Sequence, residues 1–151
     1  MRTISFRQYL TICFIFLLTT SISSAMSDQT PSPKVAKAPY KVVFQVTDSD
    51  AQKWNLTLVN AMNVITELGK HNVAIEIVVY GPAIDMLKLE SEVAPRVDEV
   101  IRHGVNVVAC ENTMHGERLT PADMLPDLDF TRTGVVYLME KQKKGYAYIR
   151  P

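Results

Sequence analysis

The sequence predicts an α/β protein with one three-layer α/β/α domain, built on a mostly parallel sheet of about four to five strands. Short runs rich in β-branched residues recur along the chain, as expected for strands buried on both faces. Stretches with apolar residues at helical spacing separate these runs, and alternation of strands with helices is typical of parallel sheets. The length of 151 residues leaves room for one such core.

The first 25 residues have the pattern of a bacterial signal peptide. Arg2 and Arg7 give it a positive start, a short apolar stretch covers residues 10–22, and small residues precede Met26. We therefore expect cleavage before Met26 and export to the periplasm. Retention of residues 1–25 as an N-terminal anchor is the alternative, although the apolar stretch is short for a membrane span.

Cleavage would leave a weakly acidic chain with a single cysteine. The full sequence has 16 basic and 16 acidic residues; residues 1–25 hold two of the basic and none of the acidic ones, so 14 and 16 remain, a net charge of −2. This balance argues against binding to nucleic acid or to a membrane surface. With Cys13 removed, Cys110 has no cysteine of its own chain to pair with, which excludes a disulfide framework.

The predicted domain covers residues 40–151 and follows a polar, proline-containing linker over residues 26–39. Its first strand is expected over residues 42–46. The polar segment Thr-Asp-Ser-Asp comes next and offers several N-caps for a long helix with Trp54 on its apolar face. We expect this helix to end at Gly69, because glycine takes the left-handed C-cap conformation without strain.

The central part of the domain continues the alternation. Buried strands are expected over residues 73–80 and 105–109, the second with Cys110 at its carboxyl end. Between them we expect two helices, a short one over residues 83–89 and another over residues 93–103.

The last third of the chain is less regular. Thr120 and the proline after it predict the start of a short helix. Residues 134–144 either form a helix capped by Thr133 or contribute a strand, over residues 135–139, to a hairpin with residues 146–149. The preceding alternation favours the helix, with residues 146–149 as a further strand.

Polar loops follow three of the predicted strands. Residues 47–50, 80–82 and 110–115 each leave the carboxyl end of a strand. Ligands of open parallel sheets bind outside these ends. The convergence of the loops directs attention to Cys110.

Cys110 is the strongest candidate for chemistry. A thiol at a strand end can receive backbone N–H donors or a neighbouring imidazole, both of which favour a nucleophilic thiolate. The carboxylate of Glu111 opposes this unless it points away. His115 is either a candidate base for the thiol or a solvated loop residue. The alternative interpretation of Cys110 is a buried, inert cysteine.

Other chemistry has weaker support. Cys110, Met114 and His115 are soft ligands that would suit copper(I), but their spacing matches no standard metal-binding pattern. Asp48 and Asp50 form either an acid pair at the sheet edge or helix caps, and capping is favoured. No glycine-rich phosphate loop follows the first strand. We therefore expect no metal and no cofactor.

Four segments make the chain from Lys41 onward resemble the DsrE/DsrF-like family, specifically its exported members. The segments are KVVFQVTDSD at the first strand, YGP after the second, VVACENTM around the end of the third, and GYAYIRP at the C-terminus. The resemblance implies a three-layer α/β/α domain that forms symmetric homo-oligomers, often trimers or hexamers.

The resemblance also implies a role for the cysteine. Cytoplasmic members include sulfur-relay proteins that hold sulfane sulfur as a persulfide on one cysteine, and Cys110 lies where that cysteine would fall. We therefore expect a periplasmic sulfur carrier or sulfurtransferase-like protein, supplied by a sulfur-donor protein or a small sulfur compound. Asn112 and His115 are candidates to orient or protonate the sulfur. The alternative is a non-enzymatic oligomeric module that binds a small ligand or soft metal, with Cys110 structural.

Overall fold

The computed structural model describes residue 38 and residues 40–151, so the expected signal peptide and nearly all of the expected linker lie outside the described residues. The elements in chain order are β1 (Tyr40–Val46), α1 (Ala51–Leu68), β2 (Val73–Val79), the 3-10 helix η1 (Gly81–Leu87), α2 (Ala94–Arg102), β3 (Asn106–Cys110), α3 (Glu111–Gly116), the 3-10 helix η2 (Pro121–Asp123), β4 (Asp129–Thr131), α4 (Gly134–Lys143) and β5 (Ala147–Ile149).

The five strands form one sheet in the order β4-β3-β2-β1-β5, and every neighbouring pair is parallel. This confirms the predicted fold class. The sequence analysis missed β4, because three residues, two of them exposed, are too short to establish a strand pattern.

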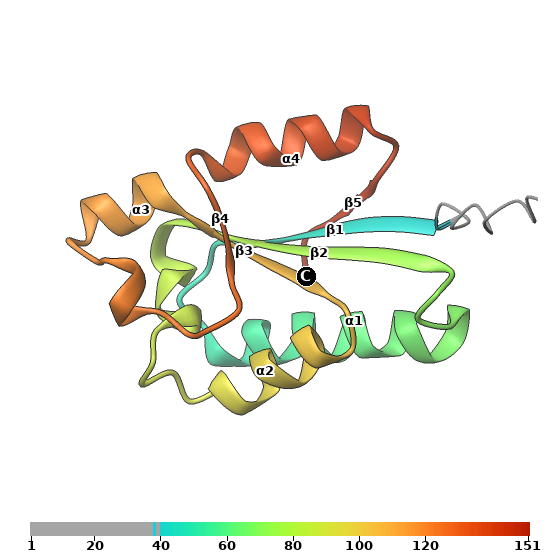
Figure 1. The fold of residues 1–151 in the computed structure, drawn as a ribbon, viewed down its shortest axis with the longest axis horizontal. Helices are drawn as coiled ribbons and strands as arrows, with labels where there is room; N and C mark the ends of the chain where they lie inside the picture. The colour runs from blue at the N-terminus through green and yellow to red at the C-terminus, as the bar shows by residue number, and fades with distance from the viewer. Residues whose placement is uncertain (1–37, 39) are drawn as a thin grey trace, which may run out of the picture. The chain divides into compact units, whose positions relative to one another are not determined.

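Helices cover both faces of the sheet and complete the three layers. Figure 1 shows α1 and α2 on one face and α4 on the other. Right-handed crossovers explain this arrangement. The chain moves in one direction from β1 to β4, with α1 and α2 on one face, and α4 then carries it back across the opposite face to β5, beside β1 (Figure 1).

Each face of the sheet has its own core. The larger core lies under α1 and α2 and includes Phe44, Leu58 and Ile77, all almost completely buried. The smaller core lies under α4 and consists of Val43, Val78, Val108 and Leu138. Because side chains alternate across a strand, Val108 and Cys110 of β3 belong to the face that α4 covers.

The predicted caps of α1 are confirmed. The carboxylate of Asp50 accepts a hydrogen bond from the Gln52 backbone N–H at 2.9 Å, and Gly69 ends the helix with φ of +82°. Trp54 is buried in the larger core. Its indole Nε1–H donates to the Asp48 carbonyl at 2.6 Å, which fixes the loop between β1 and α1.

The ambiguous segment before the C-terminus is a helix, so the hairpin alternative is wrong. α4 runs over Gly134–Lys143, and β5 pairs in parallel with β1, with Phe44 opposite Ile149. The two short helices expected around residues 83–89 and after Thr120 are 3-10 helices. None of the helices within residues 40–151 combines the length and the apolar composition that a membrane span requires.

Candidate functional site

Cys110 ends β3, whose following connection runs to one face of the sheet, whereas the connection after the neighbouring strand β4 runs to the other face. Cys110 stands opposite Thr131, the last residue of β4. The chain after β3 packs its Met114 and Leu128 into the core under α1 and α2. The chain after β4 instead enters α4 on the other face. Such switch points at the carboxyl ends of strands are the usual ligand sites of open α/β sheets.

The thiol is enclosed by residues 132–134, which we name the 132–134 loop. The Gly134 backbone N–H donates to Cys110 Sγ at 3.3 Å, and Sγ lies 3.8 Å from the Arg132 carbonyl oxygen, its hydrogen-bond acceptor. The cysteine as a whole is 4% exposed. The sulfur is therefore held between the end of one strand and the first turn of α4.

Position 134 requires a glycine because the Tyr80 side chain packs directly against its backbone. A Cβ at this position would lie 2.8 Å from Cδ1 of the Tyr80 ring and 3.2 Å from Tyr80 Cβ, which leaves no room for a side chain. Burial raises the pKa of the Tyr80 phenol, and the nearby Tyr148 and, more weakly, Cys110 raise it further. Tyr80 thus lies within electrostatic range of the thiol and packs on the residue that binds the sulfur.

Sequence reasoning missed both Tyr80 and Gly134 as site residues. The available signals were Tyr80 at the end of a buried strand and a glycine directly after the predicted cap Thr133. Neither signal indicates which strand ends become neighbours, because that depends on the order of the strands in the sheet.

Asn112 contacts the 132–134 loop rather than the sulfur. Its backbone N–H donates to the Arg132 carbonyl at 3.2 Å, and its side-chain Nδ2 donates to Thr133 Oγ1 at 3.2 Å. His115 is exposed in the last turn of α3 and has no hydrogen bond to Cys110 among the contacts of the described chain. The structure therefore brings Asn112, but not His115, to the surroundings of the thiol.

The three soft ligands considered for copper do not converge. Met114 is buried in the core under α1 and α2, whereas Cys110 faces α4 and His115 faces solvent. Within the residues that the structure describes, no group of three or more histidine, cysteine, aspartate or glutamate side chains is arranged to hold a metal ion.

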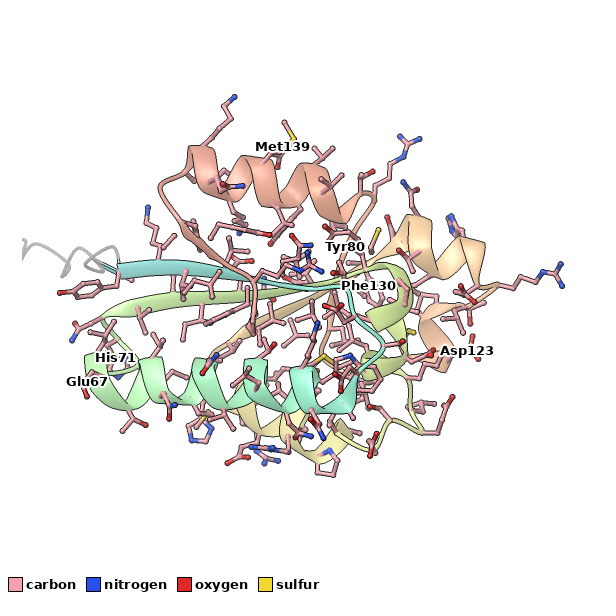
Figure 2. The ribbon with its side chains drawn as sticks, turned by 180° about the vertical axis from the view of Figure 1, so that it is seen from behind. Glu67, His71, Tyr80, Asp123, Phe130 and Met139 are labelled. Atoms are coloured by element: carbon pink, nitrogen blue, oxygen red, sulfur yellow. The ribbon has the colours of Figure 1, made fainter. Side chains whose placement is uncertain are left out.

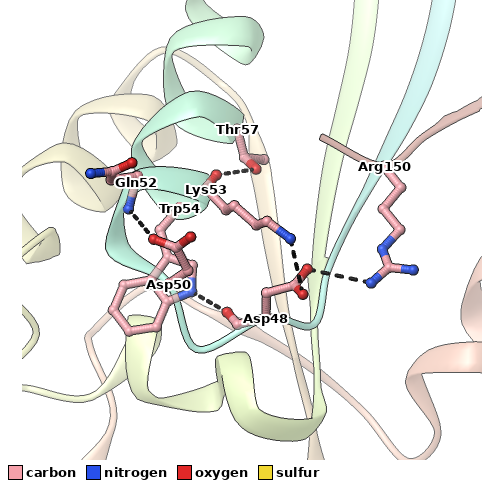
Figure 3. Close-up of polar contacts among 7 residues, drawn as sticks. All are labelled: Asp48, Asp50, Gln52, Lys53, Trp54, Thr57 and Arg150. Atoms are coloured by element: carbon pink, nitrogen blue, oxygen red, sulfur yellow. Dashed lines mark hydrogen bonds and ion pairs between the residues drawn. The ribbon is translucent and has the colours of Figure 1, made fainter.

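Asp48 and Asp50 have separate roles. Asp50 caps α1. The Asp48 carboxylate forms ion pairs with Lys53 at 3.1 Å and with Arg150 at 3.4 Å (Figure 3). The hydrogen bond from Lys53 holds the pKa of Asp48 below its usual value, and Arg150 adds to this effect. These contacts tie the C-terminal segment to the start of α1, and only Asp50 is a helix cap.

A buried carboxylate anchors α4 to the sheet. Glu76 of β2 accepts hydrogen bonds from Tyr137 Oη at 2.6 Å, Asn106 Nδ2 at 3.2 Å and Tyr146 Oη at 3.3 Å, and it forms an ion pair with Lys141. A buried charge is tolerated when it is paired and hydrogen-bonded in this way. We name these five residues the Glu76 network; by holding α4 in place, it also sets the position of the helix start that binds the sulfur.

Two surface pockets lie away from Cys110. One, of about 350 Å³, is lined by Trp54, Asp85, Lys88, Glu90, Ser91 and Glu92. The other, of about 220 Å³, is lined by Ala38, Lys41, Ala74, Lys144 and Tyr146. Neither is lined by a cysteine, so the thiol remains the candidate for sulfur chemistry.

Comparison with known proteins supports the sequence-based resemblance. Residues 40–151 match the sequence profile of the DsrE/DsrF-like family. No curated protein sequence matches the chain significantly. Among solved structures, a protein of unknown function from Methanobacterium thermoautotrophicum is 33% identical, with a TM-score of 0.71 over 74% of this chain and 99% of its own.

Two more distant structures share the fold alone. A conserved protein of unknown function from Bacteroides thetaiotaomicron is 17% identical, with a TM-score of 0.61 over 74% of this chain and 94% of its own. The ychN protein from E. coli is 10% identical, with a TM-score of 0.61 over 74% of this chain and 98% of its own.

Proposed function

Since the chain belongs to the DsrE/DsrF-like family, we propose that it is a sulfur carrier that holds sulfane sulfur as a persulfide on Cys110. The observation that carries the proposal is the hydrogen bond from the Gly134 N–H to Cys110 Sγ at 3.3 Å. The sulfur lies at the sheet's switch point, against the first turn of α4.

The start of α4 suits a negatively charged sulfur. The first N–H groups of a helix have no partner within the helix, and the aligned peptide dipoles place partial positive charge there. A persulfide is a stronger acid than a thiol and is an anion at neutral pH. The charge of a persulfide lies mainly on its outer sulfur, one bond from Sγ, so the positive end of α4 would stabilise the persulfide more than a neutral thiol.

The loading step is an exchange at sulfur. The Cys110 thiolate attacks the sulfane sulfur of a donor, a new S–S bond forms on Cys110, and the donor's own bond to that sulfur breaks. The donor leaves with the electron pair, so no external oxidant or reductant is needed. Delivery to an acceptor thiolate reverses these roles and regenerates Cys110.

We assign Asn112 a positioning role in this step, because it holds the 132–134 loop through Arg132 and Thr133. Asn112→Ala should loosen the loop and therefore speed native alkylation of the buried Cys110, which reacts through opening of this loop. The role of His115 in protonating the sulfur stays a prediction. His115→Ala should leave the pH dependence of loading unchanged if the exposed imidazole takes no part.

The test is the intact mass of the protein after incubation with a sulfane-sulfur donor. The proposal expects the gain of one sulfur atom that a reductant removes, and expects Cys110→Ser to lack it. Cys110 is the only cysteine of residues 26–151, so a chain without residues 1–25 needs no further site assignment. A native mass that stays unchanged with several donors would refute the carrier function.

The second candidate is the non-enzymatic module with a structural cysteine, and the 4% exposure of Cys110 favours it. Alkylation in the native state separates the two functions. A carrier thiol should react at a rate set by local opening of the 132–134 loop, far faster than global unfolding. A structural thiol should react only as fast as the protein unfolds.

We also propose that copies of the domain associate through the outer side of α4. Val135, Val136 and Met139 are 51%, 46% and 59% exposed there, and Figure 2 shows Met139 pointing away from the sheet. Apolar side chains gathered on one helix face are typical of an interface. Light scattering should give a trimer or hexamer, and Val136→Asp should shift it toward monomer. A monomeric wild-type protein would refute this proposal.

Export to the periplasm is likewise a proposal, supported by the charge and apolar pattern of residues 1–25. Expression of the full chain in a bacterium, followed by fractionation and N-terminal sequencing, tests it. The expected result is a periplasmic protein that begins at Met26. A full-length chain in the membrane fraction would instead indicate a retained anchor.

A further inference from the structure

Arg132 has its backbone fixed at the thiol and its side chain unpaired. Its carbonyl oxygen accepts hydrogen bonds from the Asn112 N–H at 3.2 Å and from Cys110 Sγ at 3.8 Å. The residue is exposed, and none of the ion pairs or side-chain hydrogen bonds within residues 40–151 involves its guanidinium. A cationic side chain thus leaves the backbone at a residue that contacts the nucleophile, and it has no carboxylate partner among the described residues.

Three other charged residues of the loops at this edge are partly compensated or acidic. Arg150 and Lys53 share the Asp48 carboxylate, so part of their charge is compensated. Glu111, partly exposed and next to Cys110 in the chain, has the opposite sign to Arg132. With Arg132 left aside, these charges sum to about zero, and Arg132 adds the positive charge that would favour an anion.

From this geometry we propose that Arg132 determines substrate specificity by attracting a small anionic sulfur donor, such as a sulfur oxyanion, to Cys110. The inference rests on the proposed carrier function and names its substrate class. An arginine guanidinium is suited to such ligands, because its planar fork of N–H donors matches the oxygens of an oxyanion. With thiosulfate, attack of the thiolate on the outer sulfur forms the persulfide and releases sulfite, which balances the exchange.

The first experiment measures charge selectivity without any sulfur donor. Iodoacetate and iodoacetamide alkylate the same thiolate and differ in charge, so the ratio of their rates cancels the thiolate population. Arg132→Gln should lower the iodoacetate to iodoacetamide ratio about two- to fourfold at low ionic strength, and about 1 M salt should abolish the difference. Arg132→Lys should keep most of the wild-type ratio, and Glu111→Gln should raise it.

Lys70→Gln is the matched control. It removes the same charge from the turn between α1 and β2, next to His71, which Figure 2 shows at the opposite end of the sheet from Tyr80. The ratio should not change in this variant. The proposal would be overturned if the ratio did not change in Arg132→Gln, or if it fell equally in Lys70→Gln. The Arg132→Lys variant, which keeps the charge, separates loss of charge from loss of structure.

The second experiment compares two donors on the wild-type protein and on Arg132→Gln. Thiosulfate is anionic, and an organic trisulfide is uncharged. We expect Arg132→Gln to slow loading by thiosulfate more than loading by the trisulfide. Equal slowing with both donors would contradict a role in specificity. If neither donor loads the wild-type protein, the carrier function itself fails, whereas the alkylation ratio still decides whether Arg132 selects anions.

Discussion

Replacement of Gly134 by alanine tests how closely the sulfur site is packed. The added Cβ would lie 2.8 Å from Cδ1, 3.1 Å from Cγ and 3.2 Å from Cβ of Tyr80. Carbon atoms prefer a separation of about 3.5–4.0 Å, so the ring or α4 must move by roughly 0.5–1 Å. Two of the three contacts are to atoms near the Tyr80 backbone, which a change of ring rotamer relieves only in part.

The expected cost follows from this overlap. Overpacking a well-packed site costs typically about 1–3 kcal/mol, and the preference of helices for alanine over glycine returns up to about 1 kcal/mol. We therefore expect Gly134→Ala to lose roughly 1–2 kcal/mol of unfolding free energy. With a urea dependence of about 2 kcal/mol/M, the midpoint should fall by about 0.5–1 M. Movement of the Gly134 N–H away from Sγ should also change the native alkylation rate of Cys110.

The control and the refuting result are both available in this chain. Gly116, at the end of α3, has open space around its Cβ position, so Gly116→Ala should leave stability unchanged or slightly raised. In a Tyr80→Ala background, Gly134→Ala should lose most of its cost, because the overlapping ring is gone. A Gly134→Ala protein as stable as wild type, with unchanged Cys110 reactivity, would refute the packing argument.

Three further predictions concern the scaffold of the site. Glu76→Ala should cost about 3–5 kcal/mol in chemical denaturation, because it leaves the Lys141 ammonium buried without its partner, and a loss below 1 kcal/mol would contradict this. Burial, and then the hydrogen bond to Glu76, raise the pKa of Tyr137 above its usual 10.0. A raised pKa means that the folded state favours the protonated phenol, so its contribution to the unfolding free energy should be fully present below pH 10 and should decrease above it. Tyr137→Phe should therefore reduce the loss of stability at alkaline pH. Asp50→Ala, which removes the cap on the Gln52 N–H, should cost about 0.5–2 kcal/mol by thermal unfolding, with Asp50→Asn nearly neutral.

Much of the fold follows from local sequence patterns. The apolar run around Phe44 predicts a buried strand, and Asp50 and Gly69 predict the ends of α1, because capping depends on residues next to each other in the chain. Cys110 likewise appears at the end of a strand from sequence alone. The three residues of β4 were missed, since their pairing with β3 is what makes them a strand.

The surroundings of the thiol depend on strand order. Gly134 and Arg132 are more than twenty residues from Cys110 in sequence, and they meet its sulfur only because β4 lies beside β3. Glu76 shows the same dependence: its sequence position in an apolar strand predicts burial, whereas its partners Tyr137 and Lys141 come from the helix that crosses back over the sheet.

The sequence by itself therefore determined the α/β class, the family resemblance, the ends of α1 and the position of Cys110 at the carboxyl edge of the sheet. The tertiary structure confirmed the favoured helix over residues 134–143, and it alone decided the close contact of Tyr80 with Gly134 and the N–H that reaches the sulfur. The physical reason is range. Caps and periodicity act over a few residues. The site instead forms where β3 and β4 lie side by side and their following connections run to opposite faces, and no local pattern indicates which distant residues meet there.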